Sequence, residues 1–159
     1  MTQFEGDPKA APQARFLIVA AKFNRWITDR LVESAKEAFK AAGVSDDRID
    51  LARVPGSFEL PQAALAAAKT GKYAAIACLG AVIRGETSHD RHVAESAARG
   101  IEEVAIATGV PVTLGVITAE TTEQAEARSQ PGTGRNMGGD AARAAVEMAS
   151  LTAALKGAS

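Results

Sequence analysis

Short apolar runs alternate along this chain with longer stretches in which apolar residues recur at helical spacing. The apolar runs cover residues 16–21, 49–54, 74–79 and 112–118, and each has the length of a buried strand. In the stretches between them, apolar residues recur at intervals of three and four, which predicts helices that bury one face. The chain is therefore expected to repeat a unit of strand followed by helix.

The ends of the expected helices carry recognisable signals. Glycine follows three of them, in the position that commonly ends a helix, at residues 43, 71 and 109. Thr121 and Gln124 have the spacing of a capping box, which predicts the start of a short fourth helix. The other expected helices cover residues 27–42, about 60–70 and about 89–108, and a last one follows Pro131.

Strands that are separated by helices favour a parallel sheet, because parallel neighbours need a crossover connection. We expect an α/β fold, a three-layer α/β/α sandwich with a four-stranded parallel sheet of the flavodoxin-like kind. Residues 15–159 are expected to form a single domain, since 159 residues leave no room for a second. Residues 1–14 have no apolar period and are expected to be a flexible N-terminal arm or an edge strand lent to a neighbour.

Composition and charge exclude several classes of partner. Lys and Arg number 18 against 19 Asp and Glu, without a basic stripe, which argues against nucleic acid. No apolar run approaches the ~20 residues that cross a bilayer, and the first 14 residues lack a signal-peptide core, so we expect a cytoplasmic protein without membrane contact. Cys78 is the only cysteine and lies in an apolar run, which predicts a buried thiol. With only two histidines besides, the spacing of a metal site is missing, and we expect no metal.

Ligands of open parallel sheets bind outside the carboxyl ends of the strands. Four segments follow or end the predicted strands and are expected to meet there. They are residues 23–24, residues 54–59, the loop 80–89, and the end of the fourth strand with Leu114 and residues 118–120.

The loop 80–89 is a candidate anion site. Residues 85–88 precede a predicted helix, where free main-chain amides and the helix dipole bind phosphate or carboxylate. It is not a phosphate-binding P-loop, because Glu86 stands where that motif needs lysine. Ordinary helix capping by Thr87 or Ser88 explains the same residues equally well. His89 follows, and histidine exchanges protons near neutral pH, although a helix-start histidine without a chemical task is the simpler alternative.

The other rim segments carry aromatic and charged side chains. Phe23 and Phe58 offer flat faces on which a heteroaromatic ring can stack, with core packing as the alternative. Glu59 can accept hydrogen bonds from sugar hydroxyls or simply favour the first turn of a helix. Arg128, expected on the short fourth helix, can hold an anion with two hydrogen bonds or be solvated.

Several ordered motifs of the chain together resemble those of the lumazine synthase family. The likeness extends from Arg15 to Leu155. It lies in residues 22–24, 27–28, 54–61, 79–87 with His89, 115–118, 123–125, Arg128 and 144–148.

The resemblance implies an enzyme without a cofactor. Members of the family condense 5-amino-6-(D-ribitylamino)uracil with 3,4-dihydroxy-2-butanone 4-phosphate to 6,7-dimethyl-8-ribityllumazine, phosphate and water, the penultimate step of riboflavin biosynthesis. The resemblance further implies that Phe23 stacks on the pyrimidinedione and that His89 donates a proton. The other implied substrate-binding residues are Ser57, Phe58, Glu59, Ala81, Val82 and Ile83 at the pyrimidine and ribityl chain, Glu86, Thr87 and Arg128 at the phosphate, and Leu114 in the pocket lining.

The resemblance also implies a homo-oligomer. Family members form pentamers whose sites are shared by adjacent subunits, and many stack twelve pentamers into an icosahedral capsid. Leu114 and Arg128 would then come from the neighbouring subunit. The chain departs from the family at Met137, which replaces a usual lysine, and at residues 90–92, which replace a more aromatic stretch. A non-catalytic lumazine or flavin binder, a structural shell, and another enzyme of phosphorylated sugars are the alternatives.

Overall fold

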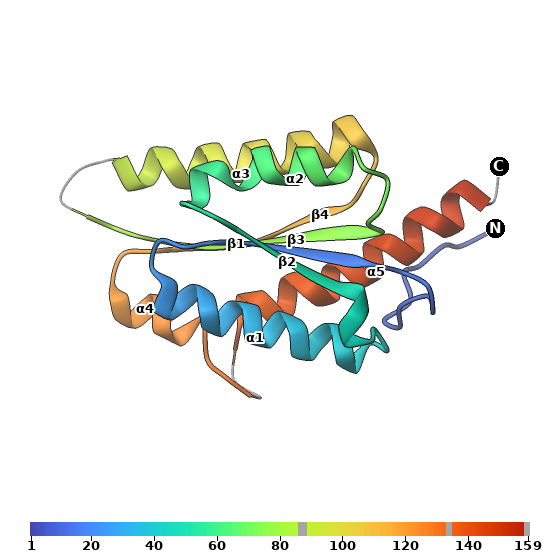
Figure 1. Ribbon diagram of the computed structural model, residues 1–159, viewed down its shortest axis with the longest axis horizontal. Helices are drawn as coiled ribbons and strands as arrows, with labels where there is room; N and C mark the ends of the chain where they lie inside the picture. Colours follow the sequence, from blue (N-terminus) through green and yellow to red (C-terminus); the bar gives the residue numbers. More distant parts are fainter. Residues whose placement is uncertain (86–88, 133–134, 158–159) are drawn as a thin grey trace.

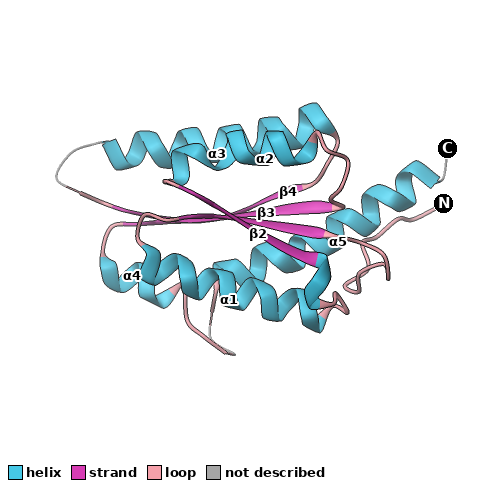
Figure 2. Ribbon diagram, viewed as in Figure 1, coloured by secondary structure: helices cyan, strands magenta, loops and turns pink. Residues whose placement is uncertain are grey.

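The computed structural model describes residues 1–85, 89–132 and 135–157. It has three layers, with a twisted sheet between two layers of helices (Figure 1). Figure 2 shows α2 and α3 over one face of the sheet and α1, α4 and α5 over the other. The elements are β1 (Phe16–Ala21), α1 (Arg25–Ala41), η1 (Asp46–Arg48), β2 (Ile49–Val54), η2 (Ser57–Glu59), α2 (Leu60–Ala68), β3 (Ala75–Ile83), α3 (His89–Thr108), β4 (Val112–Ala119), α4 (Thr122–Ala127) and α5 (Met137–Gly157).

The four strands are all parallel and lie in the order β2-β1-β3-β4. This confirms the three-layer α/β fold with a parallel sheet. From β1 the chain first adds β2 on one side and then crosses to add β3 on the other side. The sheet therefore has a topological switch point between β1 and β3, the place where such folds bind ligands.

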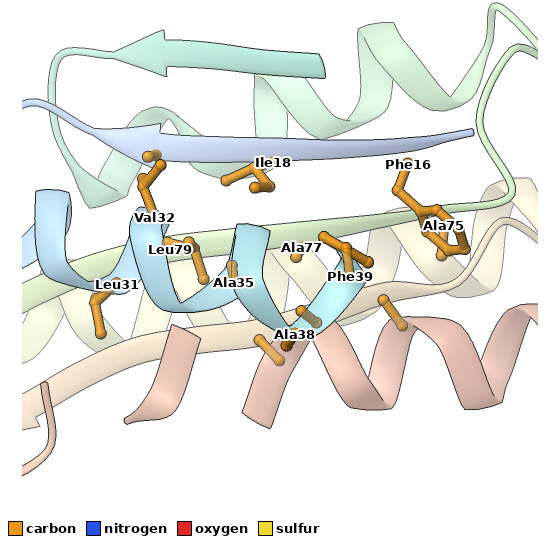
Figure 3. Close-up of a cluster of buried hydrophobic side chains, with 14 of the residues drawn as sticks. Phe16, Ile18, Leu31, Val32, Ala35, Ala38, Phe39, Ala75, Ala77 and Leu79 are labelled. Carbon is orange, nitrogen blue, oxygen red and sulfur yellow. The ribbon is translucent and has the colours of Figure 1, made fainter. Parts of the chain in front are cut away.

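Both faces of the central strands are buried, which explains why β1 reads as an unbroken apolar run. Its residues alternate between two apolar clusters, with Ile18 facing α1 and α5 and Val19 facing α2 and α3. The rings of Phe16 and Phe39 stack with their centroids 4.8 Å apart at one end of the first cluster (Figure 3). The sheet is therefore covered by a packed core on each of its faces.

The helix boundaries largely follow the sequence signals. Gly43 and Gly109 have φ angles of 93° and 73°, which confirms the left-handed glycines expected after helices. The Thr121 hydroxyl accepts a hydrogen bond from the Gln124 amide at 3.2 Å, which confirms the capping interaction. The short helix that follows ends at Ala127, so the expectation that Arg128 lies on it is wrong.

The third and fourth strands are longer than expected. β3 continues to Ile83, because it stays paired with β4 up to the pair Ile83↔Ala119. The expectation of a loop from Gly80 onward is therefore wrong for its first four residues. Gly80 does not break the strand, since it stays paired with Val116. A Cβ atom at this position would collide with the Ser57 side chain. The glycine serves a close approach between strand and loop.

The N-terminal residues lie against helices of the same chain. The Asp7 amide donates a hydrogen bond to the Ser150 hydroxyl at 2.6 Å, and the Ala10 amide donates to the Ala42 carbonyl at 2.9 Å.

Across the described part of the chain, none of the helices combines the length and apolar character needed to cross a membrane.

Candidate functional site

A pocket of about 470 Å³ opens at the carboxyl edge of the sheet, at the switch point between β1 and β3. Its walls come from the end of β1, the η2 turn, the end of β3 and the first turn of α3. Eight of the residues expected at the site line it. They are Phe23, Ser57, Phe58, Glu59, Ala81, Val82, Ile83 and His89.

Two aromatic rings stand at the pocket with little of their surface buried. The side chains of Phe23 and Phe58 are 72% and 62% exposed, which excludes core packing as their role within the chain. The Phe23 amide donates to the Pro55 carbonyl at 3.1 Å, and the Lys22 amide donates to Val54 at 2.7 Å. These bonds extend the β1–β2 pairing past the strand ends and hold the Phe23 ring at the surface. An exposed ring fixed by main-chain bonds is suited to stacking on a planar ligand.

The η2 turn brings Ser57 and Glu59 to the pocket from the end of β2. Ser57 is buried against Gly80, and the Glu59 amide donates to the Gly56 carbonyl at 3.2 Å. Glu59 then serves as the N-cap of α2 without any side-chain cap bond. Its carboxylate is half-buried and lines the pocket, where it can accept hydrogen bonds from ligand hydroxyls.

The β3 wall differs from the expected loop. Ala81, Val82 and Ile83 form the last three residues of the strand, and the first two are buried. The wall is therefore apolar and rigid, because paired neighbours hold it in the sheet. It lines the same pocket as the Phe23 ring.

His89 begins α3 at the lip of the pocket, as expected. Its neighbour Asp90 also lines the pocket and was not among the expected residues, since a charged residue in a first helical turn carries no signal of its own. Of the expected anion cradle, Gly85 lines the pocket, while Glu86 and Thr87 lie outside the described residues.

Leu114 and Arg128 are not brought to this pocket within the chain. Leu114 pairs with Cys78 in the middle of β4, so the expectation that it lies at the end of the strand is wrong. Its half-exposed side chain lines a separate groove with Ile106 of α3. Arg128 follows α4, and its guanidinium donates to the Thr118 carbonyl at 2.8 Å. That bond ties Arg128 to the carboxyl end of β4.

Charged residues surround a second hollow of about 690 Å³ between α3 and the end of β4. The Arg84 guanidinium donates to the Glu120 carboxylate at 2.7 Å, and this hydrogen bond raises the pKa of Arg84. The pair joins the ends of β3 and β4 beside Gly85. Arg84 was not expected as a site residue, because a single charged residue after a strand is common.

Two other expectations bear on the chemistry of the site. Cys78 is fully buried, and burial raises the pKa of its thiol to about 12, which confirms it as a core residue. Over residues 1–85, 89–132 and 135–157, the side chains of His, Cys, Asp and Glu form no group of three that is placed to hold a metal ion.

Fold and site together define a class of protein. It is a three-layer α/β protein with a pocket at the switch point of its sheet, and the pocket combines exposed aromatic rings, a carboxylate and a histidine. Comparison with known proteins gives the family: residues 13–153 match the family described as 6,7-dimethyl-8-ribityllumazine synthase.

Similar proteins carry the same description. The chain is 46% identical over 151 residues to a 6,7-dimethyl-8-ribityllumazine synthase of Xanthomonas campestris pv. campestris (strain B100), covering 95% of this chain and 97% of that protein. It is 44% identical over 156 residues to one of Gloeobacter violaceus, covering 96% and 86% of the two chains. One of Desulfatibacillum aliphaticivorans is 44% identical over 147 residues, covering 92% and 94%. The chain belongs to the 6,7-dimethyl-8-ribityllumazine synthase family.

Proposed function

We propose that this chain condenses 5-amino-6-(D-ribitylamino)uracil with 3,4-dihydroxy-2-butanone 4-phosphate to 6,7-dimethyl-8-ribityllumazine, in the penultimate step of riboflavin biosynthesis. The observation that carries the proposal is the pocket at the β1–β3 switch point. It places an exposed phenylalanine, an apolar strand wall and a histidine around one cavity. Family membership over nearly the whole chain supports it.

The pyrimidinedione is proposed to lie between the Phe23 ring and the end of β3. Phe23 stacks on the planar ring, and Ala81, Val82 and Ile83 contact its edge. The η2 turn with Ser57, Phe58 and Glu59 holds the ribityl chain, whose hydroxyls match a carboxylate acceptor. Both walls are preformed, because strand pairing and main-chain bonds hold them.

The phosphorylated ketone is proposed to bind beside His89, with Glu86, Thr87 and Arg128 at its phosphate. The primary amine of the pyrimidine attacks the ketone carbonyl, and loss of water gives an imine. Loss of a proton from the neighbouring hydroxyl-bearing carbon expels inorganic phosphate and leaves an enol, which becomes a methyl ketone. The ribitylamino nitrogen attacks that new carbonyl, and loss of a second water closes the ring. His89 is the proposed proton donor in these steps. Much of the acceleration comes from holding two reactive molecules together.

The proposed active form is a cytoplasmic homo-oligomer, with a pentamer as its unit. Leu114 and Arg128 lie away from the pocket of their own chain, on the β4 side of the fold. The half-exposed Leu114 and the exposed Ile106 form an apolar groove there, which suits contact with a second copy. In that arrangement the two residues complete the pocket of the adjacent subunit.

The test is to mix purified protein with both substrates and to follow lumazine absorbance and phosphate release together. Equal amounts of lumazine and phosphate are expected. Binding of the pyrimidine without either product would refute the proposal and favour a non-catalytic binder. A particle-mass measurement on the same sample distinguishes a monomer, a pentamer and a 60-subunit capsid.

A further inference from the structure

Asn24 joins the two walls of the pocket. We propose that it is a positioning residue for the pyrimidine substrate, which acts through Phe23 on one side and Ala81 on the other. The inference rests on the proposed function and names a residue outside the set expected to touch substrate.

The first observation is a hydrogen bond across the switch point. The Asn24 side-chain amide donates to the Ala81 carbonyl at 2.9 Å. The last pair between β1 and β3 is Ala20↔Leu79, two residues before Ala81 along β3. Alternate residues of a strand direct their main-chain groups to the same side, so the Ala81 carbonyl faces the place where a longer β1 would have run. The Asn24 amide supplies the donor that the strand no longer provides.

The second observation is the conformation of Asn24 itself. With φ 56° and ψ 46°, it is the one residue other than glycine in the left-handed region among those that the structure describes. Asparagine is among the few residue types that adopt this conformation at modest cost. The turn redirects the chain from β1 into α1 directly after Phe23.

The third observation is that Asn24 stands at the N-cap of α1 but makes no side-chain cap bond. An N-cap asparagine usually accepts a hydrogen bond from an amide of the first helical turn. Here only the main-chain carbonyl begins the helix, by accepting from the Ile27 and Thr28 amides at 2.9 and 3.0 Å. The side chain instead forms its bond to a strand 57 residues away.

These three observations give Asn24 a function in the geometry of the pocket. The Phe23 ring is mostly exposed, and the main-chain amide of Phe23 is held on the β2 side by its bond to the Pro55 carbonyl. The Asn24 amide fixes the same segment on the β3 side, and so sets the separation between the stacking ring and the Ala81 wall. The pyrimidine ring of the substrate contacts both walls equally in the bound state and in the transition state. Loss of the bond should therefore weaken pyrimidine binding while leaving turnover nearly unchanged.

Three substitutions separate the hydrogen bond from the backbone conformation. Asn24→Gly keeps the left-handed turn and removes the amide. Asn24→Asp keeps the shape and tolerates the turn, but an ionised carboxylate cannot donate to Ala81. Asn24→Ala removes the amide and strains the turn. The matched control is Thr113→Val, which removes a hydroxyl that donates to the Ala141 carbonyl at 2.8 Å, outside the pocket.

The measurement is the KM of each substrate and kcat for the four variants and the unaltered protein. Trp26 is the only tryptophan and lies in the first turn of α1, so its fluorescence reports whether that turn is intact. For Asn24→Gly and Asn24→Asp we expect KM for the pyrimidine to rise by about 5- to 30-fold, the factor that corresponds to one lost hydrogen bond to a buried carbonyl. KM for the phosphorylated ketone, kcat and Trp26 emission should stay near their original values. Thr113→Val should change neither KM.

Several results would overturn the inference. One is an unchanged pyrimidine KM in Asn24→Gly or Asn24→Asp. If only Asn24→Ala is impaired, the backbone turn alone matters, and the hydrogen bond does not position the substrate. Another is an equal loss for both substrates, which indicates a general structural role. Should Asn24→Gly fail to fold, Asn24→Asp decides on its own. If the unaltered protein makes no lumazine, both the proposed function and this inference fail. If the unaltered protein makes lumazine and the variants have the same pyrimidine KM, only this inference fails.

Discussion

Asp50 is the centre of a charged cluster at the amino end of the sheet, opposite the pocket. Its carboxylate accepts hydrogen bonds from the Tyr73 hydroxyl at 2.7 Å and from the Arg15 guanidinium at 3.0 Å, and Lys72 lies 3.2 Å away. The Tyr73 hydrogen bond, together with the Arg15 and Lys72 cations, lowers the pKa of Asp50 from 3.8 to about 2. Asp50→Asn removes this charge while keeping the shape of the side chain.

The size of the effect follows from the pKa. A carboxyl whose pKa falls from 3.8 to about 2 on folding adds at most about 2.5 kcal/mol to the free energy of unfolding at neutral pH. Because 30% of the Asp50 side chain is exposed, solvent screening reduces this to roughly 1–2 kcal/mol. The folded-state pKa is the lower one, so the stabilisation is present in full above about pH 4. It is lost as the pH falls toward about 2, and about half of it remains at pH 3.

The assay is urea unfolding followed by circular dichroism at pH 7, 5 and 3. All samples need one protein concentration, since association changes the apparent stability. Asp50→Asn should be less stable than the unaltered protein by roughly 1–2 kcal/mol at pH 7 and 5, and by about half as much at pH 3. The control is Asp46→Asn, whose side chain is 81% exposed beside Lys40 and should cost about 0.5 kcal/mol or less. A difference that is equally large at pH 3 and pH 7, or equal for both variants, would refute this reasoning.

Three further predictions concern the pocket. His89→Ala should lower kcat by about 10²-fold and leave measurable condensation, because proximity of the substrates supplies the remaining acceleration. Single-turnover rates measure the remaining condensation, and complete loss of product would contradict the prediction. Arg128→Ala should raise KM for the phosphorylated ketone about tenfold or more, because it removes a charge-assisted contact. The control Arg143→Ala, on the exposed side of α5, should leave this KM unchanged. An equal KM in both variants would remove Arg128 from the phosphate site. Phe23→Ala should weaken pyrimidine binding about 2- to 10-fold through lost stacking, as measured by calorimetric titration, with the exposed Phe4→Ala as a control that leaves affinity unchanged.

The order of elements was readable from the sequence because each signal was local. The period of apolar residues distinguished strands from helices, and glycines with positive φ ended α1 and α3 where expected. The sequence predicts a loop at residues 80–83, but these residues continue β3. Pairing with β4 keeps them in the sheet, and that pairing joins residues more than thirty positions apart.

The candidate site was readable in part. Phe23, Phe58 and His89 could be assigned to one rim, because the carboxyl ends of parallel strands meet at one edge. Whether the two rings would face the core or the solvent could not be read, since a phenylalanine fits either place. Their exposure depends on where η2 and the β1–α1 turn lie in three dimensions.

The sequence by itself determined the class of fold, the order of its elements and the loops that could carry chemistry, since periodicity and capping act over a few residues. Only the tertiary structure decided that Leu114 lines a groove separate from the pocket, that Arg128 is tied to the end of β4, and that Asn24 bonds to Ala81 on the neighbouring strand. These three facts depend on strand register and on where β1 stops relative to β3. Register is a relation between distant segments, and it is fixed by the packing of the whole sheet between its two helical layers.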